Sequence, residues 1–295
     1  MLKRTLAFTK PYHLSLKNQQ MIIKAKDESG SCTSVPVEDI GFVILENQEI
    51  SITMPLLNAL ADNNAAVILC SDKFMPNAMF MNLDSNSTQG ESFRAQLSAA
   101  EPLKKNLWKQ IVEAKIRNQA ALLRKLDKDG DSLKPYYQNV KSGDSDNREG
   151  VAAKIYWNEL FDEKFMRFRT GPSPNEMLNY GYTVLRAAVA RSLTGSGLLP
   201  AIGIFHRNRY NAFPLADDVM EPYRPFVDEI VFHLYANGEN SLNKYSKSEI
   251  LKLLYTDTFF ENVTRPLDIG LSITTASLAK CYNGLQKKII YPLLK

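Results

Sequence analysis

One histidine and two acidic residues in the segment 201–230 have the types and spacing of a metal site. His206 ends an apolar run, and Asp218 and Glu221 follow it. Two acids three positions apart share one face of a helix, where like charges repel unless a cation separates them. Carboxylate oxygens suit hard divalent cations, and one imidazole favours Mn²⁺ or Mg²⁺ over Ca²⁺. The alternative for His206 is a core imidazole that hydrogen-bonds a backbone carbonyl.

A kinked helix is expected to position these acids. Pro214 suits a first helical position, and apolar residues recur every three or four positions over 215–234. Pro222 and Pro225 lack backbone donors, so each frees a carbonyl one turn earlier. Asp217 lies off the shared face and is expected to serve the helix dipole.

A third carboxylate, Glu149, follows a turn-rich stretch in "DNREGVAAKIYW". It stands where a helix is expected to begin, and the helix dipole favours a carboxylate there. Together with His206, Asp218 and Glu221 it would complete an octahedral site that leaves room for substrate oxygens. On spacing alone, an ordinary first-turn glutamate explains it better.

The composition indicates a folded protein of one large or two modest domains. Of 295 residues, 44% are hydrophobic and 23% are charged, which excludes global disorder. The formal charge of +4 permits a polyanion as a partner without requiring one. The basic helix expected over 101–126, with Lys104, Lys105 and Lys109, is either a solvated face or a nucleic-acid footprint.

The chain lacks the sequence signals of membrane insertion and of zinc binding. No apolar run approaches the roughly 18 residues of a membrane span, and the N-terminal segment has no apolar signal core. Cys32, Cys70 and Cys281 form no CxxC pair, which predicts reduced thiols in the core. We therefore expect a soluble, cytoplasmic protein.

The hydrophobic pattern changes along the chain, and this change predicts an α+β protein. Short alternating runs around "KNQQ", "IGFVILE" and "AAVILC" predict a small β-rich domain at 1–84. The polar stretch 85–92 is expected to be a linker. Residues 93–295 follow the helical period and predict a larger all-α catalytic domain.

These pieces together resemble the CRISPR adaptation integrase, the larger of the two proteins found in nearly all spacer-acquisition systems. The resemblance rests on "NREGVAAKIYW" around Glu149, on "LNYGYTVLRAAVARSLTGSGLLPAIGIFH" ending at His206, and on "NAFPLADDVMEPYRPFVDEIV". The last stretch contains Asp218 and Glu221. "NQQMIIK" and "IGFVILEN" resemble the family's β-rich domain, and "HRNRYNAFPLADD" is most similar to the type II systems.

The resemblance implies a β-rich domain that dimerises and a helical domain that binds Mg²⁺ or Mn²⁺ through Glu149, His206 and Glu221. Asp218 is implied to assist catalysis. The second acid is glutamate, whereas other branches carry aspartate, so the ligand atom is the same but its reach is one methylene longer. The implied reaction is integration: the 3′-hydroxyl of a short captured duplex attacks a phosphodiester at the edge of a CRISPR repeat. Endonuclease activity accompanies it.

The resemblance also implies partners. These are double-stranded DNA, a second copy of the chain, and the small universal CRISPR adaptation protein that bridges two dimers in a prokaryotic cytoplasm. Arg207 and Arg209 flank His206 and are expected to contact DNA phosphates. Arg224 is expected either to do the same or to pair with Asp228.

Two other functions remain open at this stage. A stand-alone metal-dependent nuclease acting on branched DNA repair intermediates would share the same ligands. A non-catalytic helical scaffold would bind DNA through the basic helix alone. Strand joining distinguishes the first from the integrase, and insensitivity to a chelator would identify the second.

Overall fold

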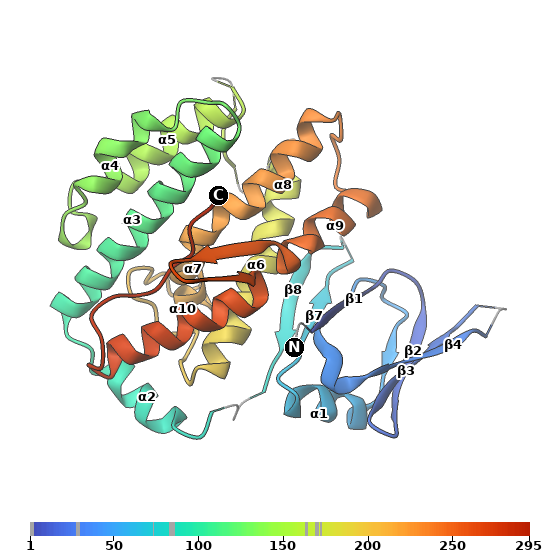
Figure 1. The fold of residues 1–295 in the computed structure, drawn as a ribbon. Coiled ribbons are helices and arrows are strands. Elements are labelled where there is room, and N and C mark those ends of the chain that lie inside the picture. Colours follow the sequence, from blue (N-terminus) through green and yellow to red (C-terminus); the bar gives the residue numbers. More distant parts are fainter. Residues whose placement is uncertain are drawn as a thin grey trace. The chain divides into compact units, whose positions relative to one another are not determined.

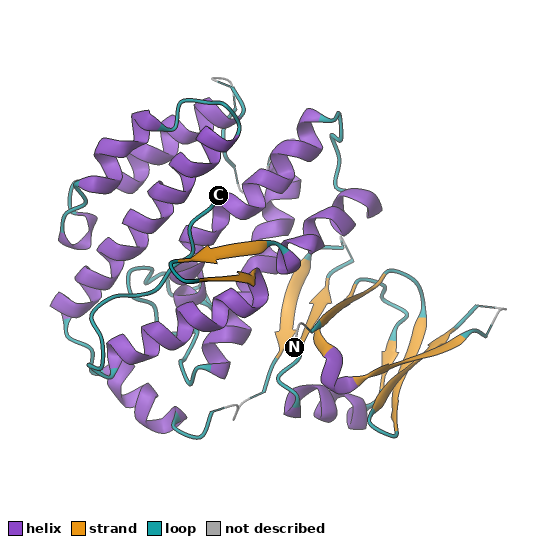
Figure 2. Ribbon diagram, in the orientation of Figure 1, coloured by secondary structure: helices purple, strands orange, loops and turns teal. Residues whose placement is uncertain are grey.

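The structure, a computed structural model, describes residues 3–27, 30–72, 74–82, 86–162, 165–168, 171 and 173–295. It divides into two compact units, Met1–Ser87 and Thr88–Lys295. The first unit is rich in strands and the second is mainly helical, as the colours of Figure 2 show. The expected α+β class is confirmed. Among the described residues, no helix combines the length and the apolar character that a membrane crossing requires.

Two details differ from the expected domain plan. The linker expected at 85–92 is only partly a loop, because α2 (Gln89–Leu97) begins inside it, and residue 85 lies outside the described residues. The second unit is not all-α, because it contains an antiparallel hairpin of β9 (Asp257–Phe260) and β10 (Val263–Pro266). Aromatic and β-branched residues in this short stretch favour strands over a helix.

The first unit holds two four-stranded sheets, with strand orders β1-β5-β7-β8 and β4-β3-β2-β6. The first sheet is parallel except for β8, and β5 is buried along its whole length between β1 and β7. The elements of this unit are β1 (Arg4–Phe8), β2 (Tyr12–Lys17), β3 (Gln20–Ala25), β4 (Cys32–Pro36), η1 (Val37–Asp39), β5 (Ile40–Leu45), β6 (Ser51–Ile52), α1 (Met54–Asp62), β7 (Ala66–Cys70) and β8 (Pro76–Phe80).

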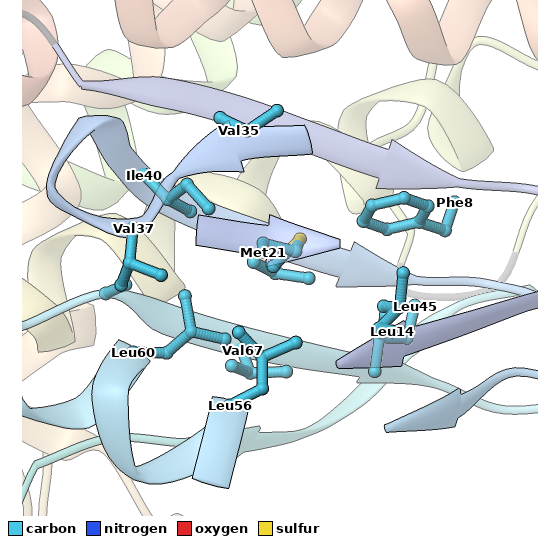
Figure 3. Close-up of a cluster of buried hydrophobic side chains, with 12 residues drawn as sticks. Phe8, Leu14, Met21, Val35, Val37, Ile40, Leu45, Leu56, Leu60 and Val67 are labelled. Carbon is cyan, nitrogen blue, oxygen red and sulfur yellow. The ribbon is translucent and has the colours of Figure 1, made fainter. Parts of the chain in front are cut away.

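The predicted "KNQQ" turn is confirmed as the hairpin between β2 and β3. Asn18 and Gln19 occupy the two turn positions with φ of 50° and 58°, the left-handed conformation that two-residue hairpins favour. The core of the unit lies between the strands and α1 (Figure 3). Cys32 is exposed, so the prediction of buried thiols holds only for Cys70 and Cys281.

The second unit is built around the long helix α3 (Glu101–Lys125), which lies beside α4 and α5 in Figure 1. With 25 residues at about 1.5 Å per residue it extends roughly 37 Å. The remaining elements are η2 (Asp131–Leu133), α4 (Lys134–Gln138), η3 (Ser142–Asp144), α5 (Arg148–Leu160), α6 (Asn175–Gly195), α7 (Pro214–Met220), η4 (Glu221–Tyr223), α8 (Arg224–Ala236), α9 (Lys244–Leu251), η5 (Lys252–Tyr255) and α10 (Leu267–Tyr282).

Helix α3 buries polar groups as well as apolar ones. Asn118 is fully buried, and its amide donates to the carbonyls of Pro222 at 2.8 Å and Pro292 at 3.1 Å. Its oxygen accepts from the backbone N–H of Leu294 at 3.1 Å. One side chain therefore ties α3 both to η4 and to the segment 292–294.

The expected kink is present, and it divides one predicted helix into α7, η4 and α8. The tight turn η4 contains Pro222, and Pro225 follows one residue into α8. Both prolines remove a backbone donor from the helical ladder. The break changes the direction in which side chains before and after it point.

Gly181 allows α6 to lie against α8. A Cβ built at Gly181 would lie 2.4 Å from Cγ1 of Val227 and 3.2 Å from Cγ2 of Ile250. No larger residue fits without moving α8, which carries Asp228 next to Val227. The close approach therefore fixes one wall of the site described below.

We expect Gly181→Ala to lower the free energy of unfolding by about 1–2 kcal/mol, because overpacking outweighs the higher helix propensity of alanine. Gly90→Ala in α2 is the matched control, since a Cβ there meets nothing within 4 Å. The control should be neutral or stabilising by up to about 1 kcal/mol. Urea unfolding followed by circular dichroism measures both, and equal effects would contradict the packing explanation.

Candidate active site

The two predicted glutamate ligands meet on one lysine. The ammonium of Lys115 on α3 lies 2.6 Å from Oε1 of Glu149 on α5 and 2.6 Å from Oε2 of Glu221 in η4. The side chains of Lys115 and Glu221 are only 11% and 5% exposed, and that of Glu149 is 23% exposed. Three elements far apart in sequence thus converge on one buried cation.

The opening of α5 is fixed by its own polar residues. Asn147 accepts from the backbone N–H of Gly150 at 3.3 Å and caps the helix. The carboxylate of Asp144 accepts from the backbone N–H groups of Arg148 at 2.8 Å and Glu149 at 3.1 Å. Glu149 lies in the first turn of α5, as predicted from the sequence.

Charges around Glu221 outweigh the cost of its burial. Desolvation favours the neutral acid, but the cations Arg224 and Lys115 lower the pKa of Glu221 to about 2. Burial disfavours the charged form of Lys115, yet Glu221 and Glu149 raise its pKa. Arg224 donates from Nε to Oε1 of Glu221 at 2.9 Å and lies over the ring of Tyr182 at 4.4 Å.

Asp218 forms a separate unit with His206. Its fully buried carboxylate accepts from the backbone N–H groups of Ile204 at 2.6 Å, Phe205 at 3.0 Å and His206 at 3.2 Å. The imidazole of His206 donates from Nδ1 to Oδ1 of Asp218 at 2.6 Å. This hydrogen bond raises the pKa of His206 against the opposing effect of partial burial.

The loop that carries His206 is held on both sides. A Cβ at Gly203 would lie 2.5 Å from the carbonyl oxygen of His206 and 3.1 Å from Oδ2 of Asp218, so only glycine fits there. Gln96 of α2 donates to the carbonyls of Leu199 and Ile202 at 3.0 and 2.9 Å. The imidazole therefore has a fixed orientation although its side chain is 40% exposed.

The structure corrects one expectation about the acids. Asp218 and Glu221 do not point at a shared cation, because the turn at η4 separates their directions: Asp218 binds the His206 loop and Glu221 binds Lys115 and Arg224. In the part of the chain that the structure describes, no three His, Cys, Asp or Glu side chains converge closely enough to hold a metal ion. The convergence expected of Glu149, His206 and Glu221 is thus incomplete in this arrangement.

The donor chemistry nevertheless fits a divalent ion. Glu149 and Glu221 already present carboxylate oxygens to one cationic atom. The Glu221 side chain is buried, and its Oε2 faces the same ammonium as Oε1 of Glu149. His206 uses Nδ1 for a carboxylate, which is how a metal-binding histidine is normally oriented so that Nε2 faces the metal.

The family model for the CRISPR associated protein Cas1 matches residues 6–266. The chain belongs to the Cas1 family. It is 42% identical over 256 residues to the CRISPR-associated endonuclease Cas1 of Neisseria meningitidis serogroup C (strain 8013), which covers 85% of this chain and 83% of that protein. The expected resemblance is confirmed.

Solved structures share the Cas1 fold found here. A casposase bound to integration product is similar over 98% of this chain and 92% of that chain, with a TM-score of 0.80 at 20% identity. A Cas6-RT-Cas1–Cas2 complex is similar over 100% of this chain and 37% of that chain, with a TM-score of 0.76 at 19% identity. At these identities the likeness concerns the fold.

A cavity of about 250 Å³ adjoins Glu221 in this Cas1 chain. Its lining includes Asp228, whose carboxylate accepts from the hydroxyls of Tyr156, at 2.7 Å, and Tyr182. Burial raises the pKa of Asp228 to about 6, although these hydrogen bonds and nearby arginines oppose the shift. The expected pairing of Asp228 with Arg224 is not formed, because Arg224 donates to Glu221 instead.

Three of the predicted basic residues surround a second cavity of about 420 Å³: Lys104, Lys105 and Arg207. Its apolar lining includes Phe205 and Trp108, whose rings stack with centroids 4.2 Å apart. The other predicted basic residues do not line this cavity: Lys109 pairs with Glu113, Arg209 lies over Tyr210, and Arg224 holds Glu221.

The role of Lys115 was not predicted. This lysine falls within the basic helix expected over 101–126, whereas the structure buries it between two acids. A signal was present: Leu107, Ile111 and Lys115 follow one another at four-residue spacing, so the lysine continues a buried apolar stripe. A charged residue in such a stripe needs a partner.

The raised pKa of Asp228 predicts a pH-dependent stability. The pKa of Asp228 is about 6 in the folded protein and about 4 in the unfolded chain. The protonated carboxyl therefore adds to the free energy of unfolding below pH 4, and this stabilisation is lost as the pH rises through 6. We expect the free energy of unfolding of Asp228→Asn to fall less over this pH range, by up to about 3 kcal/mol. Urea unfolding between pH 4 and 7 measures it.

Glu261→Gln provides the control for Asp228→Asn, because Glu261 is an exposed acid. It should keep the pH profile of the unmodified protein. If Asp228→Asn also kept that profile, the buried carboxyl would not titrate in this range.

Proposed function

We propose that the protein is a metal-dependent DNA integrase. It inserts short captured duplexes into a CRISPR repeat array through attack by 3′-hydroxyl ends, and it has associated endonuclease activity. The observation that carries the proposal is the convergence of Glu149 and Glu221 on one cation, beside the oriented pair His206–Asp218. Membership in the Cas1 family and a fold shared with a casposase bound to integration product support it.

Glu149, Glu221 and Nε2 of His206 would hold Mg²⁺ or Mn²⁺. The bound ion would polarise the scissile phosphate and stabilise the developing charge on the oxygens of the phosphoryl transfer. Asp218 orients the imidazole, and Arg224 fixes one oxygen of Glu221. No covalent protein intermediate is needed, because the attacking group belongs to the DNA.

The basic cavity is proposed to hold the DNA backbone next to this site. Lys104, Lys105 and Arg207 line it, and Phe205 connects it directly to His206. Glu101 partly neutralises two of these cations, with Arg207 at 3.0 Å and Lys104 at 3.8 Å. Phosphate contacts of this kind position DNA without reading its sequence.

The proposed partners are double-stranded DNA, a second copy of the chain and the small universal adaptation protein. The fold shared with a Cas6-RT-Cas1–Cas2 complex supports an assembly of this type. We propose that the β-rich unit forms the homodimer interface and that the small protein bridges two dimers. The proposed location is the prokaryotic cytoplasm.

We expect His206→Ala to reduce the joining of a short duplex to a repeat-containing plasmid by about 10²- to 10⁴-fold. Asp218→Asn should cost about 10- to 100-fold, because it acts by orienting His206. A gel assay for covalent strand joining with Mn²⁺ or Mg²⁺ measures both. A chelator should abolish the reaction.

His233→Ala is the matched control, because His233 is an exposed histidine on α8. It should retain the rate of the unmodified protein. Joining at that same rate by His206→Ala would refute the assignment. Cleavage of DNA without strand joining would instead favour the stand-alone nuclease. DNA binding that a chelator leaves unchanged, with no reaction, would favour the non-catalytic scaffold.

We expect Arg207→Ala to weaken DNA binding similarly for all sequences and to reduce the slope of log affinity against log salt by about 1. Fluorescence anisotropy of a labelled duplex, titrated at several salt concentrations, measures this slope. Lys244→Ala on α9 is the control and should leave the slope unchanged. An unchanged slope for Arg207→Ala would exclude Arg207 from the phosphate contacts.

A further inference from the structure

We propose that Lys115 is a built-in cation that holds Glu149 and Glu221 in the metal-free protein and yields them to a divalent ion by moving to Gln119. This inference rests on the proposed metal-dependent function. It assigns to Lys115 a role that differs from that of the metal ligands, because the lysine competes with the metal for the same carboxylates. Lys115 is thus a positioning residue whose ammonium has two alternative positions.

The first place is the one in the structure. The ammonium is 2.6 Å from an oxygen of each glutamate, so it occupies the point that both carboxylates face. Both contacts have the short N···O distance of a charge-assisted hydrogen bond, so one ammonium holds the two carboxylates.

The second position of the Lys115 ammonium is beside Gln119, on the same helix. Gln119 follows Lys115 by one turn of α3, and both line the cavity of about 250 Å³ beside Glu221. Oε1 of Gln119 is buried, and within the described ranges no donor bonds to it. A buried acceptor without a donor is costly, so an arriving ammonium would be stabilised there. The flexible lysine stem allows the move without a change in the helix.

Charge makes the two cations mutually exclusive. Glu149 and Glu221 are balanced by Lys115 and Arg224, the last held to Glu221 at 2.9 Å. A divalent ion added to this group would lie against a buried ammonium in a medium that screens poorly. Arg224 cannot yield, because it also lies on the ring of Tyr182. Lys115 is therefore the cation that moves.

Mn²⁺ binding to the full-length protein without DNA tests the proposal, by isothermal titration calorimetry or by the electron paramagnetic resonance signal of free Mn²⁺. The variants are Lys115→Met and Gln119→Leu. Lys125→Met is the matched control, because Lys125 is on the same helix and pairs with a glutamate at 2.6 Å away from these carboxylates. Thermal unfolding of each metal-free protein is recorded in parallel.

Removing the competitor should tighten binding. We expect Lys115→Met to bind Mn²⁺ roughly tenfold or more tightly, as for two coupled ligands, and its metal-free unfolding temperature to fall. Gln119→Leu should bind Mn²⁺ several-fold more weakly, without a lower metal-free unfolding temperature. Lys125→Met should match the unmodified affinity.

Unchanged or weaker binding by Lys115→Met would overturn the proposal, because it would make the lysine a spectator or a support for the metal. If Lys115→Met does not fold, Gln119→Leu decides alone, and unchanged binding by it overturns the proposal. Glu149→Ala and Glu221→Ala separate this failure from failure of the proposed function. Unmodified binding by both would place the metal elsewhere, whereas loss in both with no effect of Lys115 would refute only the present inference.

Discussion

The second unit is organised by one electrostatic constraint: two carboxylates from separate helices share a single buried ammonium. Burying such groups is costly unless each charge is compensated. Lys115 compensates Glu149 and Glu221, and Arg224 supplies the second positive charge. The contact joins α3, α5 and η4, which are far apart in sequence. Gln119, one turn further along α3, lines the same cavity as Lys115 and Glu221.

The proline-interrupted turn gives two acids of similar type different environments. A continuous helix would place Asp218 and Glu221 on one face, whereas the turn at η4 sends one to a loop and the other to α3. The carboxylate oxygens of Asp218 accept hydrogen bonds from three backbone N–H groups and from an imidazole. Glu221 instead binds two side-chain cations, Arg224 through Oε1 and Lys115 through Oε2. Asp218 is thus held mainly by backbone groups, whereas Glu221 is held by side-chain charges.

Much of this was predictable from local sequence. The α+β class, the "KNQQ" hairpin, the place of Glu149 in a first helical turn and the break at the prolines all depend on residues close together in the chain. The partners of the charged groups depend on contacts over long sequence distances, and periodicity does not contain them. For that reason the pairing of Lys115 with both acids, and the tyrosine hydroxyls on Asp228, became visible only in three dimensions.

The side-chain amide of Asn118 couples two segments that are distant in sequence. It donates to the carbonyl of Pro222, the residue after Glu221, and to the carbonyl of Pro292, and it accepts from the backbone N–H of Leu294. The segment 292–294 and the turn at η4 are therefore linked through one buried side chain. A displacement of this segment, for example on binding another protein, would shift Glu221 without a direct contact to it.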